Sequence, residues 1–131
     1  MSEENVEIVR RHIDTFLSGD REAALAAYHP EVVFDATLRP EGAVYRGRDG
    51  VDEAMRVWIG AWDDWKMETQ EIVDAGDHVL VVARESGRGK GSGVVIDHTV
   101  YAMFTVRDGL IVRWKGFLDR ESALEAAGLE E

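Results

Sequence analysis

The hydrophobic pattern of the chain changes once, from helical spacing to strand-like runs. Near the start, Val6, Val9, Ile13 and Phe16 recur every three or four residues and form one apolar stripe, as in an amphipathic helix. From Lys66 onward, β-branched and aromatic runs are separated by short turn sequences that suit antiparallel hairpins. The pattern predicts helices over residues 4–18, 21–28, 49–62 and 122–127, and strands over 31–38, 66–73, 78–86, 94–106 and 110–118.

The order of these elements indicates one α+β domain that spans residues 1–131. Gly19 is expected to end the first helix, and Asp20 has the side chain of a helix N-cap for the second. The segment 39–47 contains proline and glycine and is predicted to be a loop.

Two of the late strands lack the alternation of apolar and polar residues that is typical of a sheet with one solvent-exposed face. Val79–Ala83 and Val100–Phe104 are apolar at nearly every position, so both faces are expected to be covered. Helices can cover one face. The other is expected to pack against a second copy of the chain as a twofold homodimer, unless a strongly curled sheet buries part of both faces within one chain.

Composition and charge exclude several classes of protein. The 131 residues carry 15 lysines and arginines against 26 acids, a net charge of −11, which argues against nucleic-acid binding. There is no cysteine, and the four histidines lack metal-binding spacing, so we expect no metal or other cofactor. The start, MSEEN, does not look like a secretory signal, and no apolar run reaches the roughly 18 residues of a membrane helix, so we expect a cytoplasmic protein without membrane contact.

The glycine-rich stretch 87–93 lies between two predicted strands, which favours a hairpin loop over a phosphate-binding loop.

Three polar residues are candidates for chemistry. His12 lies within the apolar arc of the first helix, either as a buried histidine satisfied by one hydrogen bond or as a functional group. Asp35 has apolar neighbours on its strand, so its carboxylate either turns to solvent or sits on a protected face, where desolvation would raise its pKa and favour a role as general base. His98 shares a strand face with Ala102 and Phe104 and is placed to enter a cavity. On the last strand, Gly116 would leave room between its large neighbours.

Four segments together resemble the nuclear transport factor 2-like superfamily and, within it, the SnoaL-like group of small bacterial proteins. They read NVEIVRRHIDTFLSGDREAALAAYHPEVVF, YRGRDGVDEAMRVWIGAW, IVDAGDHVLVVARESGRGKGSG and FTVRDGLIVRWKGFLDRESALEAAGL, and cover nearly the whole chain. The resemblance implies a single SnoaL-like domain with a cone-shaped, curved antiparallel sheet. It also implies helices packed in the concave face, an internal apolar pocket and a homodimer.

The resemblance to ketosteroid isomerases and polyketide cyclases also carries residue roles. It places Asp35 at the isomerases' general base, and His12 at the tyrosine that donates a hydrogen bond to the developing oxyanion. The isomerases' second donor, an acid, corresponds to Ala102, and the acid of the cyclases corresponds to Gly116, so neither is present here.

These features support two hypotheses. The first is a cofactor-independent isomerase, cyclase or lyase that moves a proton on a small hydrophobic carbonyl compound, with Asp35 as base and His12 and His98 as donors. The second is a protein that binds a hydrophobic metabolite without changing it, and a bare dimeric interaction module is a further alternative. The pocket walls are predicted to be Met55, Trp58, Ile59, Ala102, Phe104, Trp114, Gly116 and Leu118.

Overall fold

A bent six-stranded sheet carries the four helices of the described chain. This computed structural model describes residues 2–38 and 42–128, and 39–41 of the predicted loop lie outside them. The helices are α1 (Ser2–Leu17), α2 (Arg21–Ala26), α3 (Gly47–Gly60) and α4 (Arg120–Ala126). The strands are β1 (Tyr28–Ala36), β2 (Ala43–Arg46), β3 (Trp62–Ala75), β4 (His78–Gly89), β5 (Val95–Arg107) and β6 (Leu110–Phe117).

The sheet is mixed, and in this respect it differs from the antiparallel sheet that was expected. Its strand order is β2-β1-β6-β5-β4-β3. The late strands follow one another through tight turns and pair antiparallel, whereas β1 is distant in sequence from β6 and runs parallel to it. The short edge strand β2 was predicted as loop. Its four residues pair with β1 alone, and so short a run carries almost no periodic signal.

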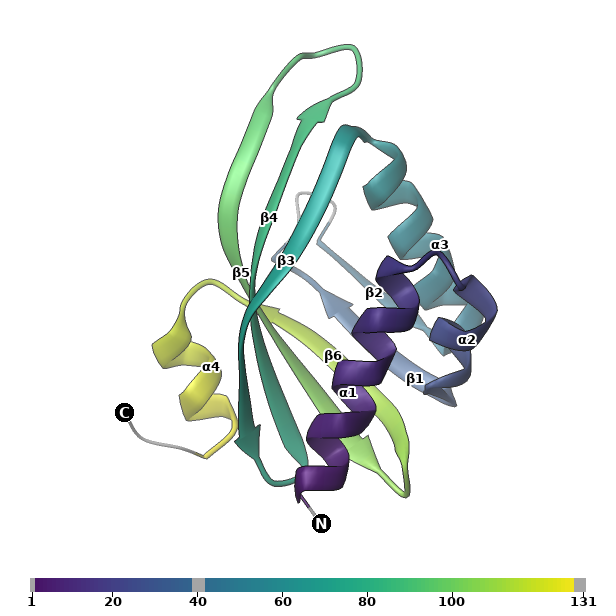
Figure 1. Ribbon diagram of the computed structural model, residues 1–131, viewed down its shortest axis with the longest axis vertical. Helices are drawn as coiled ribbons and strands as arrows, with labels where there is room; N and C mark the ends of the chain where they lie inside the picture. The colour runs from purple at the N-terminus through teal and green to yellow at the C-terminus, as the bar shows by residue number, and fades with distance from the viewer. Residues whose placement is uncertain (1, 39–41, 129–131) are drawn as a thin grey trace.

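Bulges give the sheet its curvature, and the sheet does not close into a barrel. The pairing of β3 with β4 shifts register between Asp63 and Lys66 and again between Thr69 and Glu71. Such irregularities bend and twist a strand pair. The bend produces a concave side, on which α1, α2 and α3 lie, while α4 lies away from them at the other end of the sheet (Figure 1).

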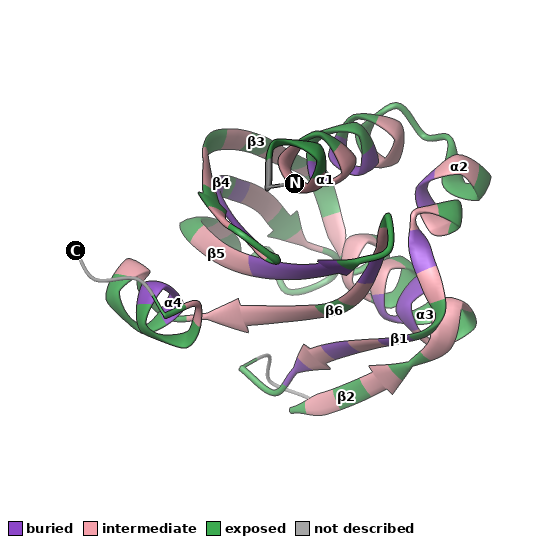
Figure 2. Ribbon diagram, turned by 90° about the horizontal axis from the view of Figure 1, so that it is seen from below, coloured by how far each residue is buried: buried purple, intermediate pink, exposed green. Residues whose placement is uncertain are grey.

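Each face of the sheet has its own apolar core. The larger one is on the concave side, where residues such as Val9, Val81 and Phe104 are buried between the strands and the first three helices. The smaller one is on the outer side, where Leu124 of α4 covers Leu80 and its neighbours. Buried positions accordingly lie on both helices and strands (Figure 2). The helix α4 therefore supplies, within one chain, part of the cover that was expected from a second copy.

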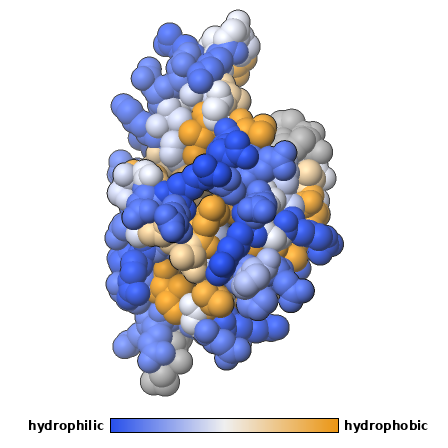
Figure 3. Space-filling view, turned by 90° about the vertical axis from the view of Figure 1, so that its right-hand side faces the viewer, coloured by the Kyte–Doolittle hydropathy of each residue, from blue (hydrophilic) through white to orange (hydrophobic). Residues whose placement is uncertain are grey.

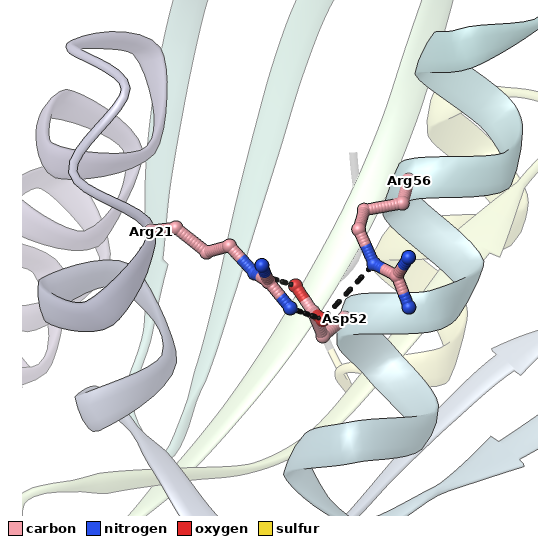
Figure 4. A network of polar contacts seen from close by, with 3 residues as sticks. All are labelled: Arg21, Asp52 and Arg56. Atoms are coloured by element: carbon pink, nitrogen blue, oxygen red, sulfur yellow. Dashed lines mark hydrogen bonds and ion pairs between the residues drawn. The ribbon is translucent and has the colours of Figure 1, made fainter.

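Local signals in the sequence set the helix positions near the concave side. Gly19 adopts a φ of 87° between α1 and α2, and Asp20 caps α2 by accepting a hydrogen bond from the backbone of Ala23 at 3.1 Å, as predicted. Asp52 of α3 is buried and accepts hydrogen bonds from Arg21 of α2 and from Arg56 (Figure 4). This network ties α2 to α3.

The surface on the side of α2 and α3 is largely hydrophilic, with hydrophobic patches between hydrophilic residues (Figure 3). No helix in the described part of the chain is long and apolar enough to span a membrane.

Candidate functional site

The concave side of the sheet holds a cavity of about 610 Å³. Helices α1 and α3 and every strand except β2 contribute to its wall, and most of the lining side chains are apolar or aromatic, as in sites for small organic molecules. Among the predicted residues, those in the wall are His12, Asp35, Met55, Trp58, His98, Ala102, Phe104, Trp114, Gly116 and Leu118. The predicted wall residue Ile59 is not among the described residues that line the cavity.

Glu85 of β4 is a second acidic side chain in this wall, and it was not predicted. Its side chain is 9% exposed. Oε2 accepts hydrogen bonds from the indole Nε1 of Trp58 on α3 and of Trp65 on β3, each at 2.8 Å. Oε1 lies 2.9 Å from Nε2 of His98 on β5. Three separate elements therefore hold one carboxylate in place.

The hydrogen bonds keep Glu85 ionised despite its burial. Burial alone would raise the pKa of the Glu85 carboxyl, but the hydrogen bonds from His98, Trp58 and Trp65 outweigh it and hold the pKa below its usual value. An ionised acid thus lies in a mostly apolar cavity.

The sequence does contain a signal for Glu85. Side chains alternate along a strand, so Glu85 shares the face of Val79, Val81 and Ala83, all of which are buried in the concave core. A single acid at an inward position of an apolar strand is rarely left without partners, because an unpaired buried charge is costly. That reasoning would have indicated the site.

His98 joins Glu85 because their positions are paired across β4 and β5. The histidine side chain is 48% exposed, and its neighbours Ala102 and Phe104 on the same strand face also line the cavity. When Nε2 donates its hydrogen to the carboxylate, Nδ1 carries the lone pair of the neutral ring. The pair therefore provides an oriented proton acceptor at the cavity wall.

His12 takes the buried alternative considered from the sequence. Its Nε2 lies 2.8 Å from the hydroxyl of Tyr28, which is also buried. Burial lowers the pKa of His12 to about 4, although the backbone of Ala24 acts more weakly in the other direction. The ring is therefore neutral at pH 7, and its Nε2 is engaged with the Tyr28 hydroxyl, which leaves it unavailable to donate to an oxyanion.

Asp35 differs from the expectation of a protected base with a raised pKa. Its strand neighbours Phe34 and Ala36 face the concave core, so alternation turns its carboxylate to the outer face. There it accepts hydrogen bonds from the Thr37 hydroxyl and backbone, and lies 3.5 Å from Arg113 and 3.8 Å from Lys115. The Thr37 hydroxyl is the main cause that holds the pKa of Asp35 below its usual value, against a smaller opposing effect of burial.

Aromatic rings form a flat part of the wall. Trp114 stacks on Phe34 with ring centroids 3.9 Å apart and planes 14° from parallel, and on Phe104 at 5.5 Å and 15°. Beside them, a Cβ atom on Gly116 would meet no other atom within 4 Å, so this glycine leaves open space in the cavity, as expected. The wall thus suits a planar, apolar molecule.

No group of three or more histidines and acids in residues 2–38 and 42–128 is arranged to hold a metal ion. The chemical groups that line the cavity include aromatic ring faces, the carboxylate of Glu85 and the imidazole of His98.

Comparisons with known proteins agree with this architecture. The family model described as SnoaL-like domain matches residues 9–114. No curated protein matches the sequence. An NTF2-like protein from Burkholderia thailandensis is 27% identical, with a TM-score of 0.76 and 95% of this chain and 97% of that chain covered. A protein from Sinorhizobium meliloti, named as a candidate polyketide cyclase, is also 27% identical, with a TM-score of 0.72 and coverage of 89% and 99%. The protein TerC, crystallised with polyporic acid, is 20% identical, with a TM-score of 0.73 and coverage of 95% and 98%.

Proposed function

The chain belongs to the SnoaL-like domain family of the nuclear transport factor 2-like superfamily, and from this premise we propose that its cavity binds a small hydrophobic carbonyl compound and that His98 removes a proton from it. The reaction is of the cofactor-independent isomerase, cyclase or lyase type. The observation that carries the proposal is the hydrogen bond between Glu85 and His98 in the wall of an apolar cavity.

The pair has the geometry of a carboxylate that orients a general base. Glu85 fixes the His98 ring by accepting from Nε2, so that Nδ1 is free to take a proton from a carbon next to a carbonyl group. The electron pair of the broken C–H bond then moves onto the carbonyl oxygen as an enolate. The imidazolium that forms is stabilised by the ionised Glu85, as in other carboxylate–histidine pairs.

This proposal keeps His98 as a catalytic residue but makes it the base, whereas the sequence hypothesis had it as a donor and assigned the base to Asp35, which here has no catalytic role. Although Asp35 is among the residues that line the cavity, its carboxylate lies beside two cations, Arg113 and Lys115, which balance its charge. His12 serves as a buried partner of Tyr28 and shapes the wall.

Two relatives support a small-molecule site on this scaffold. One is named as a candidate polyketide cyclase, and TerC was crystallised with polyporic acid. The large apolar cavity of the present chain is in keeping with a small organic ligand.

We also propose that the chain forms a homodimer through the outer face of the sheet. The partly buried Tyr101 and Phe117 border the cluster that α4 covers, and a second copy would extend that cover. Sedimentation of the purified protein tests this: a dimer supports it, and a monomer at micromolar concentration contradicts it.

Nitrobenzisoxazole tests the proton transfer without knowledge of the natural substrate. It is flat, neutral and apolar, and when a base removes its ring C–H proton, the N–O bond breaks and a coloured cyanonitrophenolate forms. We expect the wild type to turn over nitrobenzisoxazole well above the rate in buffer. The substitution His98→Gln should lower this rate about 10²-fold or more, as is usual for loss of a general base.

The matched control is His78→Gln, because His78 bonds Thr105 on the outer face. Equal rates in wild type and H98Q would contradict the proposal. Binding of the probe without turnover would instead favour the second hypothesis, a protein that holds a hydrophobic metabolite unchanged.

A further inference from the structure

The charge inside the cavity is of one sign. Glu85 and Asp35 are the acids among the described lining residues, each with a pKa held below its usual value, and that lining includes no lysine or arginine. His12 is neutral because burial lowers its pKa to about 4. The chain as a whole carries a net charge of −11, so the surrounding field has the same sign as the carboxylate.

The carboxylate of Glu85 still has room for one more hydrogen-bond donor. A carboxylate has about four lone-pair positions, and three are used by Trp58, Trp65 and His98. A ligand hydroxyl can supply the fourth bond. A ligand carboxylate in the same place would meet a like charge in surroundings of low polarity.

We infer that the cavity selects uncharged aromatic molecules that bear a hydroxyl group directed at Glu85, and that it rejects aromatic anions. The near-parallel rings of Phe34, Trp114 and Phe104 favour the flat part of such a ligand. This inference rests on the proposed function in one respect, namely that the cavity is the binding site.

Three naphthalenes substituted at the same ring position test the inference by calorimetric titration at about pH 7. Naphthol is neutral and carries a donor, methoxynaphthalene is neutral without a donor, and naphthoate is an anion. We expect naphthol to bind most tightly, methoxynaphthalene several-fold more weakly, and naphthoate at least about tenfold more weakly than naphthol.

Two variants with the same change in net charge locate the effect. Glu85→Gln should raise the affinity for naphthoate at least about fivefold relative to naphthol, because the local negative charge is gone. Glu71→Gln removes one negative charge outside the cavity, where Glu71 pairs with Arg120, and should leave the ratio unchanged. Near-ultraviolet circular dichroism of the tryptophan cluster checks that E85Q keeps the wild-type packing.

The outcomes separate the two proposals. Equal affinity of the wild type for all three ligands, or an equal response of E85Q and E71Q, would overturn the inference while leaving nitrobenzisoxazole turnover to decide the proton transfer. Lack of binding by all three would overturn the inference and the cavity's role as a binding site together. If E85Q loses the wild-type packing, the variant is set aside, and the order in which the wild type binds the three naphthalenes supports or overturns the inference.

Discussion

Glu85 and Asp35 are carboxylates on opposite faces of one sheet, and different kinds of partner stabilise their charges. Both groups have a lowered pKa, but for different reasons. Asp35 lies on the outer face beside Arg113 and Lys115, so its charge is balanced by fixed cations. Glu85 lies on the inner face and is held by two indole N–H groups and one imidazole.

The difference decides which carboxylate can take part in chemistry. Arginine and lysine keep their protons at neutral pH, so the partners of Asp35 can accept nothing from a ligand. The imidazole beside Glu85 can accept a proton, and the neighbouring carboxylate then stabilises the charge that forms. A lowered pKa alone therefore does not identify a functional acid, and its partners must be considered with it.

The largest expected difference between Glu85 and Asp35 is in the rate of proton transfer from nitrobenzisoxazole. We expect Glu85→Gln to lower kcat for nitrobenzisoxazole about 10²- to 10³-fold, because His98 loses its orienting carboxylate, by analogy with carboxylate–histidine–serine triads. KM should change little, because Glu85 acts through His98. Asp35→Asn should stay within about twofold of wild type. Similar losses in E85Q and D35N would break the comparison.

His12 on the inner side and Asp35 on the outer side should lose their contributions to folding stability at different pH values. Neutral His12 is buried, with a pKa of about 4 against 6.5 for the unfolded chain, so the unfolded state binds the proton first. Stability is therefore full above about pH 6.5 and falls by about 3 kcal/mol as the pH drops to about 4. The contribution of Asp35 is present above its unfolded pKa of 3.8 and is lost only as the pH falls further, through its lowered native value.

Urea unfolding at a series of pH values measures these contributions. His12→Phe should flatten the upper part of the curve, and Asp35→Asn should flatten only the part at lowest pH. An unchanged slope between about pH 6.5 and 4 in H12F would show that His12 is not the buried neutral group described here.

The smallest effect concerns the indole donors of Glu85. Trp58→Phe removes one N–H group and should raise the pKa of the Glu85 carboxyl, because one of the hydrogen bonds that stabilise the ionised form is lost. Carboxyl NMR measures this change. Trp62→Phe is the matched control, because Trp62 lines the same cavity, but its Nε1 has no hydrogen-bond partner among the described residues. A larger shift in W62F than in W58F would contradict the geometry.

The fold was largely predictable because its long elements carry clear periodic patterns. The resemblance to SnoaL-like proteins is confirmed, and the late strands lie close to their predicted positions. The strand β2 and the parallel pairing of β1 with β6 were missed, since the first is very short and the second joins segments far apart in sequence.

The site was predictable only in part. The strand alternation that places Glu85 inward and Asp35 outward was available in the sequence, but Asp35 was chosen for its apolar neighbours and for its position in the family resemblance. The hydrogen bonds of Glu85 with Trp58 and Trp65 could not be predicted from the sequence, because they depend on how α3 and β3 are placed relative to β4. Sequence periodicity gives the face of a residue and not its distant neighbours.

The paired small residues Ala102 and Gly116 leave part of the cavity floor to the peptide backbone. The backbone of Gly116 adopts a conformation open to any amino acid, and the space above it is empty. A single substitution at this position could therefore shorten or reshape the cavity without moving a strand or touching the Glu85–His98 pair. Such a position lets one scaffold be retuned to molecules of different length while its chemistry stays intact.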